Sequence, residues 1–369
     1  MTTETARIGV VGCGNISGVY FKNLSETEGV ELLACCDLSE ERAEKAAQTY
    51  SVPRVCTLSQ LLADPDIDIV VNLTTPEAHY SVARQAVEAG KSVYNEKPLT
   101  ATLEDGADLL KEAEKSRVLV GSAPDTFLGA GLQTCRKLLE DGWIGRPVAA
   151  TAFMLCHGHE SWHPDPEFYY KPGGGPLFDM GPYYLTALVS LLGPVKRVSG
   201  ATQISFEKRK ITSKPKFGAL IDVEVPTHAA SLLEFHDGVV ATLVTSFDVW
   251  SAQVPRIEIY GSEGTLSVPD PNGFGGPVGL RRASSSSFDQ IPLAFPNAEN
   301  SRGLGVVDMA AALFTGRPHR ASDQLAFHVL EIMHAVHTSS DTGRHIVLSS
   351  RCDRPDAFPL DLGDMEVDW

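Results

Sequence analysis

The chain has 369 residues, of which 43% are hydrophobic and 21% charged, so its composition is that of a globular protein long enough for two domains. Lysine and arginine number 31 against 47 aspartates and glutamates, and the formal net charge of −16 would repel a nucleic-acid backbone. No apolar run approaches the roughly 18 residues of a membrane span, and the seven cysteines are odd in number without paired spacing, so we expect no membrane or nucleic-acid partner and a cytoplasmic location.

From Arg7 to about Ala123, short apolar runs alternate with amphipathic stretches. The apolar runs are RIGVVG, ELLACCD, DIDIVVNLTT, KSVYNEK and RVLVGSA. Strand-like runs separated by helical patterns such as SEERAEKAAQTY are typical of βαβ units. This alternation predicts an α/β domain with a doubly wound parallel sheet over residues 1–123.

The first turn of this predicted sheet reads GCGNIS. Gly12 and Gly14 suit a tight turn that brings a pyrophosphate close to the amides at a helix start, and Asn15 and Ile16 lie in the same turn. Ser17 occupies the third glycine position of this fingerprint, a place that a small residue can fill. The position of the turn, directly after the first strand, indicates a Rossmann domain.

Asp37 lies at the end of ELLACCD, 23 residues beyond Gly14. A carboxylate there would accept hydrogen bonds from the adenosine ribose and repel a 2′-phosphate, which favours NAD over NADP. Arg42, one helical turn away, could still reach a phosphate, so NADP stays open. A second interpretation is that Asp37 or Ser39 caps the following helix, and the two roles are compatible.

The pattern changes after residue 123. A helical stretch, GAGLQTCRKLLEDGWIG, leads into RPVAATAFML, which we expect to be an edge strand. The segments VKRVSGATQI, AASLLEFHDGVVATLVTSFDVW and RIEIYGSEGTLSV read as antiparallel strands, with the clearest hairpin signal at residues 236–238. Residues 124–369 are therefore expected to form an α+β domain with an open, mostly antiparallel sheet.

Four further segments of this second domain carry expectations. The basic stretch at residues 208–210 reads as a solvated turn between strands, and PDPNGFGGPVGLRRASSSSF reads as loop. The hydrophobic periodicity of a helix recurs at MAAALF and over about 321–340, and the second of these predicted helices could pack against the first domain. The acidic, proline-interrupted stretch from 353 to 369 is expected to be an extended tail that packs on a neighbour or stays mobile.

Two motifs carry candidate chemistry. Glu96, Lys97 and Pro98 follow a predicted parallel strand, where ligands bind in open α/β sheets. The stretch GGGPLFDMGPYYL then places Asp179 and Tyr183 four residues apart, on one face of a helix that we expect to begin near Asp179. The preceding glycines allow the chain to approach a ligand closely.

With GCGNIS, LTTPEAHY, EKP and GGGPLFDMGPYY in this order, nearly the whole chain resembles the glucose-fructose oxidoreductase and inositol dehydrogenase family, also called Gfo/Idh/MocA. The resemblance implies a Rossmann domain followed by an open antiparallel sheet domain, with Lys97 beside the nicotinamide. Asp179 and Gly181 match the family motif Asp-x-Gly-x-His, and Tyr183 stands in the histidine position, as in glucose-fructose oxidoreductase and the dimeric dihydrodiol dehydrogenases. The resemblance also places Thr74, Thr75, Pro76, His79 and Glu96 on the cofactor side, although His79 suits capping or packing better than reaction.

These residues suggest roles for the catalytic set. Tyr183 would exchange the proton of a secondary alcohol while C4 of the nicotinamide takes the hydride. Lys97 would lower the pKa of the phenol and hold the alcohol oxygen, because an ammonium stabilises phenolate. Asp179 would orient the substrate or the lysine. The alternative is that Tyr183 is an ordinary half-buried core phenol.

The stretch HGHESWHPDPEFYYKP gathers aromatic and imidazole side chains upstream of the glycines. Such a mixture suits a sugar, so we expect a substrate wall that comprises Trp162, His163, Tyr169 and Tyr170, with Asp125 reaching the same cleft. For Phe247, Asp248 and Trp250, lining this cleft and packing on a sheet face remain alternatives. The spacing HxHxxxH lacks a helix-compatible pair and an obvious fourth ligand, so we expect no metal.

The sequence therefore predicts a two-domain, NAD(P)-dependent oxidoreductase that oxidises a secondary hydroxyl of a sugar, sugar derivative or cyclitol, or reduces the ketone. The alternatives are a dihydrodiol-type dehydrogenase, a cofactor-retaining sugar oxidoreductase and a non-catalytic NAD-binding sensor. Retention of Lys97, Asp179 and Tyr183 together argues against the sensor. Because an open sheet face rarely stays bare, we also expect a homodimer or homotetramer built through residues 195–268.

Overall fold

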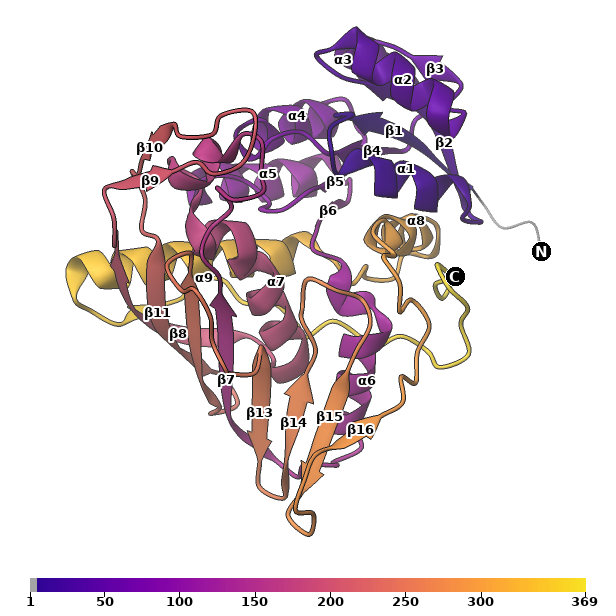
Figure 1. The fold of residues 1–369 in the computed structure, drawn as a ribbon. Coiled ribbons are helices and arrows are strands. Elements are labelled where there is room, and N and C mark those ends of the chain that lie inside the picture. The colour runs from indigo at the N-terminus through magenta and orange to yellow at the C-terminus, as the bar shows by residue number, and fades with distance from the viewer. Residues whose placement is uncertain (1–4) are drawn as a thin grey trace.

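The computed structural model describes residues 5–369 and contains two large sheets with their helices (Figure 1). The first sheet has six parallel strands in the order β3-β2-β1-β4-β5-β6. Its strands are β1 Ala6–Val11, β2 Val30–Cys36, β3 Arg54–Val55, β4 Ile69–Asn72, β5 Ser92–Asn95 and β6 Val120–Ser122. Its helices are α1 Ser17–Ser25, α2 Glu40–Tyr50, α3 Leu58–Ala63, α4 Pro76–Glu88 and α5 Leu103–Ser116.

The predicted doubly wound parallel sheet is confirmed. All residues of β4 and β5 are buried, as expected for parallel strands covered by helices on both faces. The strand order reverses between β1 and β4, which is the switch point where open α/β sheets bind ligands at the carboxyl ends of their strands.

The second sheet has nine strands in the order β16-β15-β14-β13-β7-β12-β11-β8-β17. These strands are β7 Pro147–Leu155, β8 Val195–Gln203, β11 His228–Phe235, β12 Val240–Ser246, β13 Ile257–Gly261, β14 Gly264–Val268, β15 Val278–Arg282, β16 Asp289–Ile291 and β17 Ile346–Val347. Only the β7–β12 pairing within it is parallel, so the expected open, mostly antiparallel sheet is confirmed. The hairpin at residues 236–238 joins β11 to β12, with Gly238 at φ +87°.

Three sequence-based expectations about this domain are wrong. The segment RPVAATAFML is not an edge strand, because β7 pairs with β12 on one side and β13 on the other. The stretch expected to be loop after residue 268 contains β15, which pairs with β14. The basic stretch at 208–210 forms strand β9, Lys208–Lys210, which pairs with β10, Leu220–Asp222. The partners of β7 lie far away in the sequence, whereas β9 and β15 pair with strands that are nearby in the chain; in each case strand pairing decides the structure.

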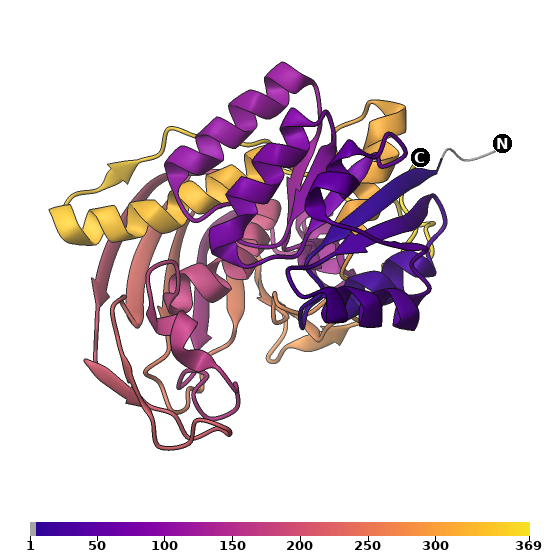
Figure 2. The same cartoon turned by 90° about the horizontal axis from the view of Figure 1, so that it is seen from above.

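Helices cover one face of the large sheet. The remaining helices are α6 Ala130–Glu140, α7 Gly175–Leu192, α8 Leu304–Thr315 and α9 Asp323–Thr342, with short 3-10 turns at Thr126–Leu128 and Pro166–Tyr170. Seen from above, α9 runs along the top of the large sheet, beside the helices of the first sheet (Figure 2). Phe327 and Leu330 of α9 pack at Gly106 of α5, and Ser122 of β6 donates its amide to the carbonyl of Ala321.

The acidic C-terminal stretch packs on its own chain rather than staying free. Asp368 pairs with Arg320, and the ring of Trp369 stacks on Phe314 at 6.4 Å between centroids. Gly29, in the turn before β2, lies so close to the Trp369 ring that no Cβ would fit there. Within the described residues, no helix is long and apolar enough to cross a membrane.

Candidate active site

The glycine loop after β1 leaves open space where a dinucleotide phosphate would lie. Gly12 has φ +97°, and a Cβ there would lie 2.7 Å from the carbonyl oxygen of Leu73, so the close approach of β1 and β4 requires glycine. A Cβ at Gly14 would meet no atom within 4 Å. The Ser17 amide at the start of α1 donates to the Gly14 carbonyl, but no side chain caps this N-terminus after Asn15 and Ile16, so the helix end remains open to an anion. The loop therefore fits a pyrophosphate.

Asp37 lies beside this loop at the carboxyl end of β2. One carboxylate oxygen accepts from the Cys13 amide at 2.8 Å, and the other accepts from the Ser39 amide and from Arg42. Burial opposes ionisation, but these donors hold the pKa of Asp37 below its usual value. Ser39, not Asp37, caps α2 by accepting from the Arg42 amide. The carboxylate is thus fixed at the edge of the loop, with an exposed guanidinium beside it.

The remaining residues expected on the cofactor side form the next turns of the same sheet edge. Thr74 donates its hydroxyl to Asn72, and Thr75 and Pro76 begin α4. His79 is fully buried, with Nδ1 2.7 Å from the Pro98 carbonyl and Nε2 3.1 Å from the Thr74 carbonyl. His79 therefore ties the turn after β4 to the turn after β5 and acts as a packing residue, the alternative that the sequence favoured.

Glu96 is buried and holds the turn that carries Lys97. Its carboxylate accepts from the Tyr20 hydroxyl of α1 at 2.9 Å and from the Lys97 amide at 2.8 Å. These two contacts connect the helix that begins at the glycine loop to the candidate catalytic lysine. Glu96 thus positions Lys97 relative to the loop.

Lys97 and Asp179 form an ion pair across the two domains. The Lys97 ammonium donates to the Asp179 carboxylate at 3.0 Å and to its main-chain carbonyl at 2.7 Å. Burial lowers the pKa of Lys97, but Asp179 and Tyr183 outweigh it and raise that pKa above its usual value. The lysine is therefore a fixed cation. Helix α7 begins at Gly175, four residues earlier than expected, so Asp179 lies inside the helix.

His159 is a member of the site that the sequence did not single out for contact with Asp179. Its Nε2 lies 3.1 Å from the second Asp179 carboxylate oxygen. Burial opposes ionisation of Asp179, but Lys97 and His159 together lower the pKa of this carboxyl group to about 2. The signal available in the sequence was only the imidazole-rich stretch itself, because a separation of 20 positions between His159 and Asp179 gives no contact pattern.

Tyr183 lies on the same helix and is almost fully buried. The Lys97 ammonium lies 5.4 Å from the centre of its ring. Lys97 and Arg302 both lower the pKa of Tyr183, as an adjacent cation should, but burial is the largest influence and the pKa is raised overall. Lys97 therefore acts in the expected direction, but burial outweighs it, so the pKa of the phenol is not lowered overall. The phenol stays protonated at neutral pH.

Arg302 is the second cation at the phenol, and sequence reasoning missed it. Its guanidinium donates to Asn300 and Asn272, and Asn23 of α1 donates to its carbonyl at 2.8 Å. Asp125 fixes the next residues by accepting from the Gly303 and Gly305 amides. The segment before α8 thus places Arg302 beside the phenol and connects it to α1 of the first domain.

The residues of the expected substrate wall divide into two groups. Trp162, His163 and Tyr169 lie in contact with one another or with His159, beside Asp179. Tyr170 and Asp125 do not face this space. Tyr170 is fully buried and donates to Glu160, while burial raises the pKa of Asp125 to about 6 as it accepts backbone amides. Both are structural residues.

Arg209 anchors the substrate wall from behind. Its guanidinium bonds Glu160 at 2.6 Å and Asp248 at 2.7 Å, and it donates to the carbonyls of His157 and Phe247. The side chain is only 4% exposed, so the expectation of a solvated basic turn is wrong. Its neighbours in sequence, Lys208 and Lys210, face solvent. Because all three residues are basic, the sequence alone did not distinguish the buried arginine from the exposed lysines.

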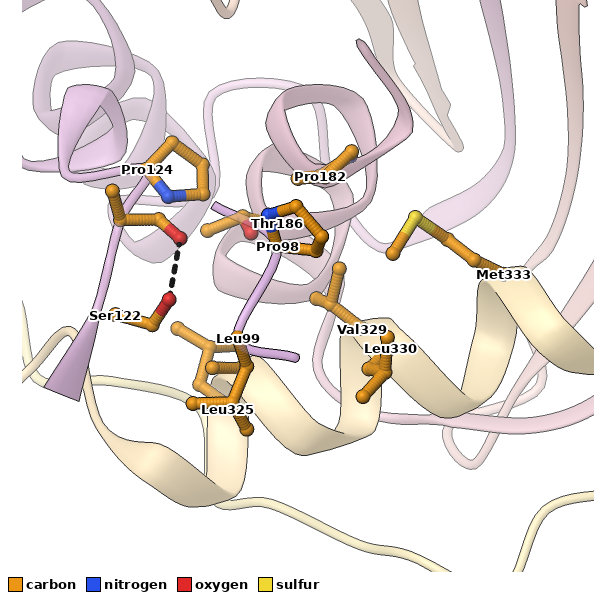
Figure 3. A pocket seen from close by; sticks show the side chains of 12 residues that line it. Pro98, Leu99, Ser122, Pro124, Pro182, Thr186, Leu325, Val329, Leu330 and Met333 are labelled. Carbon is orange, nitrogen blue, oxygen red and sulfur yellow. Dashed lines mark hydrogen bonds between the residues drawn. The ribbon is translucent and has the colours of Figure 1, made fainter. Parts of the chain in front are cut away.

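A small apolar pocket lies between the turn after β5, α7 and α9 (Figure 3). Pro98 and Pro182, the chain neighbours of Lys97 and Tyr183, line it together with Leu325, Val329 and Met333 of α9. Its lining is mostly hydrocarbon, with the hydroxyls of Ser122 and Thr186 as polar exceptions, so it suits a polyol poorly. The pocket is a packing seam that joins the EKP turn, α7 and α9.

Comparisons with known proteins agree with this geometry. Residues 6–123 match the family described as oxidoreductase family, NAD-binding Rossmann fold, and residues 132–267 match the GFO/IDH/MocA C-terminal domain. The 1,5-anhydro-D-fructose reductase of Ensifer adhaerens is 28% identical over 299 residues, covering 78% of this chain and 83% of the relative. The myo-inositol 2-dehydrogenase of Thermotoga maritima is 24% identical over 262 residues, covering 70% and 74%.

Solved structures share the whole fold. A levoglucosan dehydrogenase in complex with NADH superimposes with a TM-score of 0.81 at 18% identity, covering 94% of this chain and 100% of that chain. An NAD-binding oxidoreductase from Klebsiella pneumoniae gives a TM-score of 0.80 at 19% identity, covering 93% and 99%. At these identities the likeness shows the fold alone, while the two matched domains span most of the sequence. The chain therefore belongs to the Gfo/Idh/MocA family of NAD-binding oxidoreductases.

Proposed function

We propose that this protein transfers a hydride between NAD and a secondary hydroxyl or ketone of a sugar, sugar derivative or cyclitol. The observation that carries the proposal is the meeting of Lys97, Asp179 and Tyr183 at the edge of the first sheet, next to a glycine loop that fits a pyrophosphate. The reductase and dehydrogenase relatives, which are named for a sugar derivative and an inositol, support the substrate class.

The dinucleotide, when bound, supplies the hydride donor or acceptor. Tyr183 gives its phenolic proton to the carbonyl oxygen of a ketone, or takes the proton of the alcohol in the reverse direction. Lys97, held as an ammonium by Asp179, donates a hydrogen bond to the same oxygen and stabilises the charge that develops there. Because the pKa of Tyr183 is raised, the phenol is a ready proton donor at neutral pH, which suits ketone reduction.

The two domains divide this work. We propose residues 1–123 as the dinucleotide domain, with Gly12, Gly14 and Asp37 as its binding elements, and residues 124–369 as the substrate domain. The Asp37 carboxylate supports NAD over NADP, and Arg42 beside it supports residual use of NADP. Seven free cysteines support a reducing compartment such as the cytoplasm.

The experiment is a turnover assay with NAD and NADP against a panel of sugars, glycosides and inositols. We expect Lys97→Ala and Tyr183→Phe each to lower kcat/KM by about 100-fold or more while leaving dinucleotide binding intact. Tyr184→Phe, which removes the next phenol along α7, is the matched control and should keep full activity. Tight NAD binding without turnover of any panel member would contradict the proposal and favour a sensor.

We further propose that the uncovered face of the large sheet is the contact between copies of this chain. Its side chains include Phe153 of β7, which lies opposite Val244 of β12, and Leu232 of β11, which lies opposite Thr242. Leu232 is 47% exposed, and an open apolar sheet face of this kind is typically covered in an oligomer. Light scattering should show a dimer or tetramer that Leu232→Glu dissociates. A wild-type monomer would contradict this.

A further inference from the structure

Two large aromatic side chains stand in solvent on the segment between β7 and α7. Trp162 is 62% exposed and Phe168 is 51% exposed. Both pack edge-on against His163, with ring centroids at 5.4 Å, and Phe168 also packs on Tyr169 at 4.0 Å. Single exposed apolar residues are common, but a continuous group of exposed rings marks a surface that binds something.

This group of rings continues into the candidate active site. His159, whose Nε2 contacts Asp179, meets the ring of Trp162 at 5.2 Å and the ring of Tyr169 at 4.2 Å. Tyr169 is half-buried, whereas Trp162 and Phe168 lie further out. The rings therefore form a path that begins at the reacting position and leads outward from it.

The segment that carries the rings is fixed from below. Glu160 pairs with the buried Arg209, and the Glu160 carbonyl accepts the amides of Thr212 and Ser213. The Ser213 hydroxyl also donates to the His163 carbonyl. An exposed tryptophan on a segment with this many buried bonds is held in place before any ligand arrives, which lowers the entropic cost of stacking.

The charges near the rings are already neutralised. Lys216 pairs with Asp165 and Glu167, and Lys171 pairs with Glu224. A phosphate or carboxylate on the ligand would find no free cation among these side chains. The surface thus suits a neutral ring with an apolar face, such as a pyranose or a phenyl group.

We propose that Trp162, Phe168 and Tyr169 form a subsite for a second ring, so that the preferred substrate is a glycoside rather than a free monosaccharide. The reacting sugar lies at Asp179 and Tyr183, and the ring attached to it stacks on Trp162. This subsite rests on the proposed function, because the first sugar position is the one assigned there. It adds that the substrate extends beyond one ring.

The test compares matched pairs of methyl and phenyl glycosides of glucose, galactose and mannose, in both anomers, by calorimetry on the protein loaded with NADH. For the sugar that binds best, we expect the phenyl member to bind about five- to tenfold more tightly than the methyl member. Trp162→Ala should remove this difference, because it lowers the affinity for the phenyl glycoside more than the affinity for the methyl glycoside. Equal affinity within every pair, including no measurable binding of either member, would overturn the subsite.

The control is Trp143→Ala. Trp143 is 40% exposed and lies in the turn before β7, at the opposite end of that strand, where it packs with Arg282. The phenyl preference should survive this change, and its loss would also count against the subsite. Turnover without a phenyl preference would remove the subsite alone, whereas a Trp162-dependent preference without any turnover would remove the proposed reaction and keep the subsite.

Discussion

Tyr183 illustrates how burial and charge compete at a single residue. Burial raises its pKa most strongly, Glu96 raises it further, and Lys97 and Arg302 lower it. Two other phenols, Tyr94 and Tyr169, are influenced by Tyr183 in turn. The residue types in the motif point to Tyr183 as the proposed acid, but the sign of its net pKa shift depends on the neighbours that the fold supplies.

The protonation state of Tyr183 predicts opposite pH dependences for the two directions. Reduction needs the phenol, so its kcat/KM should be constant through neutral pH and fall only in the alkaline range. Oxidation needs phenolate, so its kcat/KM should rise with pH throughout the neutral and alkaline range, because the pKa of Tyr183 is raised above its usual value. Initial rates from pH 6 to 10.5 test this, and Tyr183→Phe should remove both dependences. A neutral-pH inflection that survives in Tyr183→Phe would assign the proton to another group.

Substitution of Arg302 should shift the alkaline rise in the pH profile of the oxidation rate. Removing a cation beside a phenol destabilises phenolate, so Arg302→Met should move the rise of the oxidation rate upward by about one pH unit, and Arg302→Lys should restore most of it. Arg281→Met, which removes an exposed guanidinium from β15, is the control and should leave the profile unchanged. If Arg302→Met lowers the rate equally at every pH, the residue acts on folding or on binding rather than on the phenol.

At the scale of elements, strand β9 shows why a short basic stretch was hard to interpret. Its three residues alternate across a strand, so Lys208 and Lys210 face solvent while Arg209 points inward. The turn that the sequence predicted there gave no reason to expect Arg209 on a different face from the two lysines. The carboxylates that meet Arg209 come from residues 160 and 248, far away in the sequence.

Arg209→Met should therefore disturb the substrate segment. It would leave Glu160 and Asp248 as buried carboxylates without their cation, at a cost of about 3–5 kcal/mol in the free energy of unfolding. Lys208→Met on the same strand, whose partner Asp222 is exposed, should cost less than about 1 kcal/mol. Urea unfolding measures both. In the folded variant, KM for the sugar should rise while KM for NAD stays unchanged, and equal destabilisation by the two substitutions would contradict the anchoring role.

Across the whole molecule, one buried arginine ties the C-terminal stretch to the region between α8 and α9. Arg320 pairs with the fully buried Asp308 and with Asp368, and its guanidinium lies 4.4 Å from the Phe358 ring centre. Trp369 then reaches the first domain beside Gly29. The stretch thus spans both domains on its own chain, where the sequence predicted either mobility or contact with a neighbour.

Substitution of Arg320 should show how much this arrangement stabilises the fold. Arg320→Gln leaves Asp308 buried without its main cation, so we expect a loss of about 3–5 kcal/mol in the free energy of unfolding. Asp368→Asn removes only the half-exposed partner and should cost about 1 kcal/mol or less. Denaturant unfolding followed by circular dichroism compares the two. A small, equal loss in both variants would show that the stretch contributes little to stability.

The sequence by itself determined the parallel sheet, the glycine loop, Asp37 and the pairing of Asp179 with Tyr183 on one helix. All of these depend on local periodicity and spacing, which short windows of sequence record. The tertiary structure alone decided the inner position of β7, the burial of Arg209, and the contacts of His159 and Arg302 with the proposed catalytic residues. Those features join residues far apart in the chain, where the balance of desolvation, charge and strand pairing depends on which neighbours the fold brings together.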